Sequence, residues 1–413
     1  MATTPSDRGH ELIDGARVLG TGTGWLARLW SGRAERLVDR IDRGLKRGAL
    51  HAILPDGSRR TLGGRAPGFE CTVELKRWRG LIRVATAGSI GLYQGWEAGD
   101  WTSPDPVALF ALFVANSDSL GDTARARGPW RWLGRLVHAL HRNSRAGSRR
   151  NIHAHYDLGN DFYAAWLDPD MVYSSARFDA GALSLAAAQQ RKLDTIVHRL
   201  AGARTVLEIG CGWGALAQRL HENGMAVTAI SLSDAQLDWA RERRAAAIDF
   251  RKQDYRDVSG QFDAIASVEM VEAVGREYWP AFFDGLVRCL RPGGRAAIQY
   301  IVIREELFPA YAASADFIQA YIFPGGMLVS EAAFRSLAAE RGLDWREPAS
   351  FAIDYAETLR IWRDAFEAAA AAERLPAGFD ERFVRLWRFY LMYCEGGFRG
   401  GGIDVRQVTL VKA

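Results

Sequence analysis

The chain has 413 residues, of which 48% are hydrophobic, and its formal net charge at pH 7 is +4. This length exceeds the roughly 250–300 residues at which a single core stops growing, so we expect two domains. The small net charge gives no indication of nucleic-acid binding, and four scattered cysteines without a CxxC pair argue against a disulfide framework or a metal site. No stretch has the roughly 18 consecutive apolar residues of a membrane span, and the first residues lack a signal-peptide pattern, so we expect a cytoplasmic protein.

Residues 1–120 are predicted to form a small α+β domain. Apolar residues recur at helical spacing between Trp25 and Ile41. Residues 49–64 and 69–88 show alternating, turn-separated patterns, with a turn at Pro55–Gly57, which favours strands. This region carries no recognisable catalytic motif.

Residues 121–150 form a basic connector, with eight arginines and no acidic residue between Arg125 and Arg150. Apolar residues from Trp130 to Leu140 recur at helical spacing, largely on faces without arginine. Such a basic amphipathic helix suits the anionic surface of a phospholipid membrane. An interdomain helix whose apolar stripe packs on its neighbours explains the pattern equally well, and RNA binding is disfavoured.

Residues 151–413 alternate strand and helix patterns, which predicts a doubly wound α/β domain with a mostly parallel sheet. The predicted strands are residues 205–210, 226–231, 262–268, 295–302 and 405–412, and a turn at residues 291–294 introduces the fourth. Helices are expected from the first strand to about residue 223 and at residues 234–243. Ligands bind beyond the C-terminal ends of such strands, so the residues there are the candidates for a functional site.

A glycine-rich loop, EIGCGWG at residues 208–214, follows the first of these strands and precedes a helix. Its spacing differs from the GxGxxG that seats a pyrophosphate and is that of class I methyltransferases, which bind S-adenosylmethionine. An ordinary tight turn is the alternative. Downstream, Ser231 and Gln236 follow the second strand without the usual acidic residue there, and Asp254 and Tyr255 follow the next, where Asp254 serves either as an adenine acceptor or as a turn cap.

Several further motifs occur together with this loop: HYDLGNDF at 155–162, MVYSS at 171–175, QDYRD at 253–257, MVE at 270–272, YIFP at 321–324 and YLMYCEGGFR at 390–399. In this combination and order, the chain resembles the cyclopropane-fatty-acyl-phospholipid synthase family, including its mycolic-acid-modifying relatives. The resemblance covers about residues 150–410. It implies a class I methyltransferase domain with a helical lid over a lipid-sized tunnel, and a small N-terminal lipid-associated domain.

The resemblance also implies roles for individual residues. The cofactor-binding residues would be Tyr173, Ser174, Glu208, Gly210, Cys211, Gly212, Trp213, Gly214, Ser231, Gln236, Asp254 and Tyr255. Glu272, Ile301 and Tyr355 match positions that hold a bicarbonate ion, which acts as the base, and Cys394 matches a cysteine that lines the active site. In two departures, Ser175 replaces a cysteine and Gln299 replaces a histidine that also holds bicarbonate, so we expect weaker bicarbonate binding.

The implied reaction transfers a methyl group from S-adenosylmethionine to the cis double bond of an unsaturated phospholipid acyl chain and closes a cyclopropane ring. An alkene is a weak nucleophile, so alignment and exclusion of water must supply most of the rate. The alternatives are alkene methylation without ring closure, an inactive lipid-binding homologue and, least favoured, an O- or N-methyltransferase of small molecules. As partners we expect the inner membrane surface and no nucleic acid, with a homodimer as a candidate assembly.

Overall fold

The computed structural model describes residues 8–9, 12, 31–121, 158–178 and 184–413. The chain divides into two compact units, one of Met1–His141, Glu306–Pro324 and Ala377–Ile403, the other of Arg142–Glu305, Gly325–Pro376 and Asp404–Ala413. Apart from Gly121, the predicted basic connector lies outside the described residues, so its role and the predicted domain boundaries beside it stay predictions.

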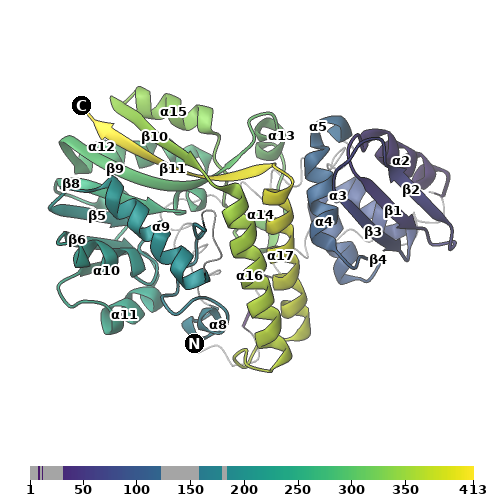
Figure 1. Cartoon of the computed structure of the whole chain (residues 1–413), viewed down its shortest axis with the longest axis horizontal. Coiled ribbons are helices and arrows are strands. Elements are labelled where there is room, and N and C mark those ends of the chain that lie inside the picture. Colours follow the sequence, from purple (N-terminus) through teal and green to yellow (C-terminus); the bar gives the residue numbers. More distant parts are fainter. Residues whose placement is uncertain (1–7, 10–11, 13–30, 122–157, 179–183) are drawn as a thin grey trace. The chain divides into compact units, whose positions relative to one another are not determined.

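The N-terminal unit contains a four-stranded sheet in the order β2-β1-β3-β4 (Figure 1). Its elements are β1 (Ala49–Ile53), β2 (Arg59–Gly63), β3 (Glu70–Leu75), β4 (Trp101–Thr102), α2 (Ser31–Gly44), α3 (Trp78–Glu97), α4 (Pro106–Ala115) and α5 (Ser117–Leu120). Strands β1 and β2 form an antiparallel hairpin across the predicted turn, where Gly57 takes a φ of 84°. The expected α+β class is confirmed.

One predicted strand pattern in this unit was wrong. The segment that follows β3 forms the 20-residue helix α3, not a further strand. Its buried Ile82, Ile90 and Tyr93 give it an inward face, and the helix is kinked at Gly88, whose φ is 58°. The alternation that favoured strands arose from short apolar clusters separated by glycine and small residues.

Three helices from later in the sequence are grouped with the N-terminal unit: α13 (Phe308–Ala312), α14 (Phe317–Tyr321) and α17 (Glu381–Arg399). Helix α17 packs closely on α4 because Gly396 has no side chain. A Cβ atom there would lie 2.5 Å from the Cβ of Phe110 and 3.0 Å from the carbonyl oxygen of Val107. Two helices that lie far apart in the sequence, α4 at Pro106–Ala115 and α17 at Glu381–Arg399, therefore share one tight contact.

The C-terminal unit is built on a seven-stranded sheet in the order β10-β11-β9-β8-β5-β6-β7. The strands are β5 (Thr205–Ile209), β6 (Ala226–Ser231), β7 (Asp249–Lys252), β8 (Phe262–Val268), β9 (Leu290–Ile303), β10 (Leu343–Ser350) and β11 (Ile403–Lys412). Strands β5 to β9 pair in parallel, and β10 pairs with β11 antiparallel. The strand order reverses between β5 and β8, so loops that follow these two strands meet at the switch point of a class I methyltransferase fold. The expected fold class is confirmed.

Helices cover both faces of this sheet (Figure 1). One layer consists of α9 (Leu185–Arg199), α10 (Ala215–Glu222) and α11 (Asp234–Arg243), whose apolar residues form a core with β5 to β9. The other contains α12 (Trp279–Cys289) and α15 (Glu331–Ala339). Among the described residues of this unit, the remaining helices are α8 (Asn160–Ala164), α16 (Ala352–Ala371) and three short 3₁₀ turns, η4 (Tyr255–Asp257), η5 (Val271–Ala273) and η6 (Arg276–Tyr278).

The predicted turn at residues 291–294 is part of strand β9 instead of preceding it. The register of β9 against β8 shifts there, between the pairs Phe262–Leu290 and Ala264–Arg295. Strand β9 therefore continues from Leu290 to Ile303, and Gln299 lies inside it.

Among the residues that the structure describes, no helix combines the length and the apolar character needed to cross a bilayer.

Replacing Gly396 with alanine should lower the free energy of unfolding by about 1–3 kcal/mol, because the new methyl group overpacks the α4–α17 contact. Gly285→Ala is the matched control. Its Cβ atom would meet its nearest neighbour at 3.6 Å inside helix α12, so it should stabilise by about 0.5–1 kcal/mol through helix propensity. Urea unfolding of both variants tests this, and equal effects would contradict the tight contact.

Candidate active site

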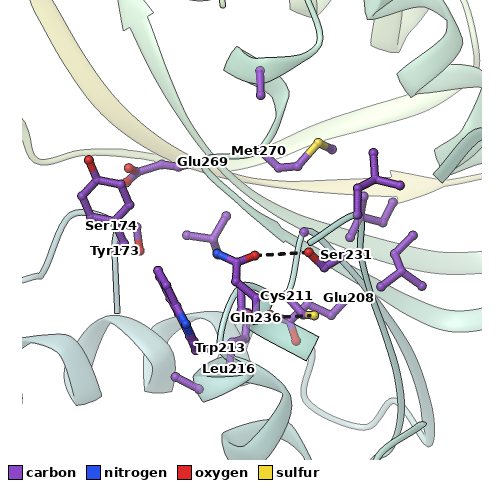
Figure 2. Close-up of a pocket in the computed structure, with 18 of the residues that line it drawn as sticks. Tyr173, Ser174, Glu208, Cys211, Trp213, Leu216, Ser231, Gln236, Glu269 and Met270 are labelled. Carbon is purple, nitrogen blue, oxygen red and sulfur yellow. Dashed lines mark hydrogen bonds between the residues drawn. The ribbon is translucent and has the colours of Figure 1, made fainter. Parts of the chain in front are cut away.

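A cavity opens at the C-terminal ends of β5, β6 and β8, where the fold reverses its strand order. All the predicted cofactor-binding residues except Gly214 line this cavity. In Figure 2, Glu269 and Met270 lie on one side of the cavity, and Cys211, Trp213 and Gln236 lie on the other. The predicted cofactor-binding residues therefore share one cavity, their role toward the cofactor stays a prediction, and the sequence did not identify Glu269.

The glycine loop between β5 and α10 needs its glycines for three different reasons. Each has a positive φ: 84° at Gly210, 51° at Gly212 and 77° at Gly214. A Cβ atom at Gly210 would lie 2.7 Å from the side chain of Met270, and one at Gly214 would lie 2.9 Å from the ring of Phe250. At Gly212 no atom lies within 4 Å, because this position faces the cavity. Gly212 thus keeps open the space that a bound cofactor would fill.

The second and third loops place polar groups on the same cavity. Ser231 donates a hydrogen bond to the Oε1 atom of Gln236 over 3.2 Å, which orients that amide (Figure 2). Asp254 accepts hydrogen bonds from the guanidinium of Arg256 at 2.6 and 2.9 Å and from its backbone N–H at 3.0 Å. Asp254 therefore caps the η4 turn, as one interpretation predicted, and it also lines the cavity, while its role as an adenine acceptor stays a prediction.

Lys192 is a buried cation beside the cavity that the sequence analysis missed. Its ammonium donates a 2.6 Å hydrogen bond to the hydroxyl of Ser174, next to the cavity-lining Tyr173. Burial lowers the pKa of Lys192 to about 8, against the opposing influence of Glu269, Asp168 and Glu208. The sequence did contain a pattern that could have identified it: Lys192 lies four residues from both Ala188 and Ile196, on the apolar face of α9.

Glu208 is a second buried ionisable group in the loop. It is 3% exposed, and burial raises its pKa to about 8, with the charge of Lys192 acting in the other direction. Together with Lys192, it places a titratable pair beside the predicted cofactor position.

Glu269 follows strand β8 directly, and its carboxylate is held by three donors. Oε1 accepts the backbone N–H of Ser175 at 2.9 Å and the Nε2 amide of Gln299 at 2.7 Å. Oε2 accepts the hydroxyl of Tyr355 at 2.7 Å. The amide of Gln299 is oriented in turn by Gln407 in β11, which donates to its Oε1 at 2.9 Å. Burial raises the pKa of Glu269, while these hydrogen bonds act to lower it.

The backbone of Glu269 is strained, with a φ of 48°. Such conformations cost a residue other than glycine of order 1–3 kcal/mol and persist where surrounding structure enforces them. Here the N–H of Glu269 donates to the carbonyl of Gln299 at 2.8 Å, which extends the β8–β9 ladder by one bond. A charged residue at the end of a buried parallel strand was the signal in the sequence that could have identified it.

Glu272 lies one turn further along, in η5, and accepts the backbone N–H of Ile301. Its Oε2 has no hydrogen-bond partner among the described residues. Burial, followed by the neighbouring charge of Glu269, raises the pKa of Glu272 to about 8. Two adjacent buried carboxylates cannot both be ionised at low cost, so at neutral pH Glu272 is mainly protonated.

The expected bicarbonate ion does not fit this arrangement. Its predicted donors, Ile301, Gln299 and Tyr355, already bind the carboxylates of Glu272 and Glu269. A bicarbonate ion would compete with these carboxylates for the same hydrogen bonds, and their negative charges would oppose it. Ile301, Gln299 and Tyr355 are hydrogen-bond donors here, but the groups that they hold are side chains of the chain itself.

The two remaining predicted residues differ in their placement. Ser175 is completely buried and uses its backbone N–H, while its hydroxyl donates to the carbonyl of Ala176 at 2.9 Å. Cys394 lies in α17, which belongs to the N-terminal unit, so its role as a lining residue stays a prediction. Burial and the charge of Asp316 raise its pKa, which makes a thiolate role unfavourable.

Glu272→Gln should make stability less dependent on pH. The folded-state pKa of about 8 lies above the ordinary value of 4.5, so the folded state holds a proton that the unfolded state releases between these values. The free energy of unfolding therefore falls as pH rises from 5 to 8, by up to about 1.4 kcal/mol per pH unit for this group. Urea unfolding at several pH values should show a shallower slope for the variant. The exposed Glu373→Gln should keep the original slope, and identical slopes for Glu272→Gln would refute this assignment.

The chain is similar to several characterised lipid-modifying enzymes. It is 39% identical over 351 residues to the tuberculostearic acid methyltransferase UfaA1 of Mycobacterium tuberculosis, covering 80% of each chain. It is 37% identical over 364 residues to the cyclopropane-fatty-acyl-phospholipid synthase of Escherichia coli, covering 84% of this chain and 89% of that one. The crystal structure of mycolic acid cyclopropane synthase CmaA1 complexed with SAH and CTAB superposes with a TM-score of 0.59 and 29% identity, over 64% of this chain and 98% of that one.

The sequence model of the mycolic acid cyclopropane synthetase family matches residues 143–408, which include the cavity and the two glutamates described above. The chain therefore belongs to this family of S-adenosylmethionine-dependent methyltransferases, which includes the cyclopropane fatty acid synthases and related lipid methyltransferases.

Proposed function

We propose that this chain transfers the methyl group of S-adenosylmethionine to a cis double bond in the acyl chain of a membrane phospholipid. One observation carries the proposal: the cavity that the glycine loop opens is also lined by a half-buried glutamate, Glu269, whose carboxylate is fixed by three donors. Binding of a sulfonium cofactor alone would not require that carboxylate, whereas a reaction that passes through a carbocation and must lose a proton does.

The chain's own residues fit the cofactor. Gly212 leaves space at the mouth of the loop, and the hydroxyl of Ser231 and the amide of Gln236 offer polar contacts to the ribose or adenine. S-adenosylmethionine would supply an electrophilic methyl group attached to a sulfonium. Glu269 and Tyr173 both line the cavity. There the carboxylate and the aromatic ring would stabilise positive charge without offering a strong nucleophile.

The first candidate product is the cyclopropane, as the sequence motifs suggested. Identity to the cyclopropane-fatty-acyl-phospholipid synthase of Escherichia coli over most of both chains supports it. The second candidate is a methyl-branched or methylene chain, supported by the 39% identity to a tuberculostearic acid methyltransferase. Both candidates begin with the same methyl transfer. The cyclopropane and the methylene chain then differ only in how the carbocation loses its proton, whereas a saturated methyl branch would need a further reduction.

The substrate places the reaction at a membrane surface. We propose that the chain works as a peripheral protein on the cytoplasmic leaflet, in keeping with the cluster of arginines between Arg125 and Arg150. The expected helical lid and acyl tunnel remain part of this proposal.

Expression in a bacterial host that lacks this activity but makes unsaturated phospholipids tests the proposal directly. Mass spectrometry should show acyl chains heavier by one CH₂ in the case of a cyclopropane or methylene product, and NMR should distinguish ring protons from those of a branched chain. The proposal would be contradicted if the lipids stay unchanged in cells that contain folded protein able to bind S-adenosylmethionine. That result would favour a binding homologue without turnover.

Gly212→Val should weaken the binding of S-adenosylmethionine by at least about a hundredfold, because a branched side chain would fill the cofactor's space and strain a backbone at φ 51°. Gly202→Val separates the two causes. Gly202 has a φ of 88°, has open space around it and lies on the exposed loop before β5, so its variant is strained without blocking the cavity. Calorimetry should therefore find near-normal affinity for Gly202→Val, and equal losses in both variants would argue against the cofactor site.

A further inference from the structure

Gln299 and Tyr355, at two of the positions that the resemblance assigned to an external anion, hold a side chain of this protein instead. The N–H of Ser175, the amide of Gln299 and the hydroxyl of Tyr355 converge on the carboxylate of Glu269, at 2.9, 2.7 and 2.7 Å. We propose that Glu269 is the base that removes a proton from the transferred methyl group, so that catalysis needs no bicarbonate ion. This inference rests on the proposed methyl transfer and names the residue that completes it.

The position of Glu269 relative to the cavity supports a direct role. Glu269 lines the cavity together with Tyr173 and the glycine loop (Figure 2). Its donors Ser175, Gln299 and Tyr355 are not among the lining residues. The donors thus stand behind the carboxylate and act as positioning residues. The group presented to the cofactor side is the glutamate itself.

The hydrogen bonds also fix the charge of the site. Three donors favour the ionised form of Glu269, and Gln299 cannot carry a positive charge that would neutralise it. The neighbouring Glu272 is mainly protonated at neutral pH, since burial raises its pKa to about 8. In its ionised form, Glu269 places a carboxylate beside the proposed position of the carbocation, with the buried cation Lys192 acting on it.

The backbone supports the same conclusion. A glutamate at a φ of 48° is strained, and a glycine would take this conformation freely. The chain has a strained glutamate at the position where the side chain accepts hydrogen bonds from Ser175, Gln299 and Tyr355, three donors that together form a donor cradle. Removing that side chain would relieve the strain and leave the three donors open to an external anion.

The chemical step balances without a further reactant. Methyl transfer converts the sulfonium to a neutral thioether and leaves a carbocation on the acyl chain. The Glu269 carboxylate then takes one proton from the added methyl group, and the electron pair of that C–H bond closes the ring. If a hydride first moves between the two chain carbons, the same electron pair forms a methylene double bond. The proton on Glu269 leaves to water when the products dissociate.

A deuterated methyl donor makes this step visible. With CD₃-labelled S-adenosylmethionine and vesicles of unsaturated phosphatidylglycerol, proton loss from the methyl group leaves two deuterium atoms in the product, for a ring and for a methylene alike. The unmodified protein should form this product at the same rate in buffer stripped of bicarbonate and in buffer with bicarbonate added.

Glu269→Gly should lower the rate of forming the two-deuterium product at least tenfold in stripped buffer, and added bicarbonate should restore it several-fold. Glu269→Gln keeps the cradle filled with a side chain that is not a base. Its rate of forming the two-deuterium product should therefore fall, and added bicarbonate should not restore it. Glu373→Gly is the matched control, because Glu373 also has a positive φ, of 51°, but is exposed after helix α16. It should behave as the unmodified protein does.

The outcomes separate this inference from the proposed function. No methylated lipid from the unmodified protein under any condition overturns the proposed function. Methylation that stops when bicarbonate is removed overturns the role of Glu269 alone, and this measurement requires no variant. A Glu269→Gly protein that binds S-adenosylmethionine normally also overturns it, either by keeping its rate in stripped buffer or by losing a rate that bicarbonate does not restore.

Discussion

One half-buried carboxylate determines how the chain must be arranged around the candidate site. An ionised side chain without partners in a protein interior is strongly destabilising, so Glu269 has to be surrounded by donors. Those donors come from the loop before α9, from β9 and from α16, and the donor from β9 is itself oriented by Gln407 in β11. Segments separated by more than two hundred residues must therefore reach their final positions together before the charge is satisfied.

The same interior contains more acidic than basic groups, and the structure manages the imbalance by protonation. Lys192 is the cation that acts on Glu208, Glu269 and Asp168 together, and burial lowers its pKa to about 8. Burial raises the pKa values of Glu208 and Glu272 to about 8, so both are mainly neutral at pH 7. The carboxylate with three hydrogen-bond donors is the one that can stay ionised, which concentrates the negative charge at Glu269.

The parallel strands could be predicted from the sequence because each is a short apolar run followed by loop residues. Strand β8 and helix α11 have the predicted limits, and the glycine loop was placed correctly between β5 and α10. Helix α3 was mistaken for strand because its apolar residues are interrupted by glycines. The edge strand β10, LDWREPAS, has little apolar content, and only its pairing with β11 makes it a strand. Contacts made by chain segments that return from far away, such as α17 on α4, have no local pattern.

The candidate site shows a similar limit. Residues in the glycine loop and after the strands could be proposed as cofactor-binding residues from their types and spacing, and nearly all of them line the cavity. Glu269 and Lys192 were missed because each is defined by what surrounds it: three donors from distant segments in one case, a hydroxyl and three carboxylates in the other. The spacing of residues in the sequence shows neither their burial nor their partners. A charged residue in an apolar stretch is therefore interpreted as a surface group.

The two departures from the family pattern become understandable once the base belongs to the chain. Position 175 contributes its backbone N–H, so its side chain is free to be a serine that bonds the neighbouring carbonyl. Position 299 faces a fixed glutamate, and a neutral amide can donate to that carboxylate without cancelling its charge as a protonated histidine would. A carboxylate that belongs to the chain also needs no binding step, because the entropy lost in positioning it has already been lost on folding. The strained backbone of Glu269 and the donors around it are then parts of one arrangement, in which stability lost at a single residue keeps the base in position through each catalytic cycle.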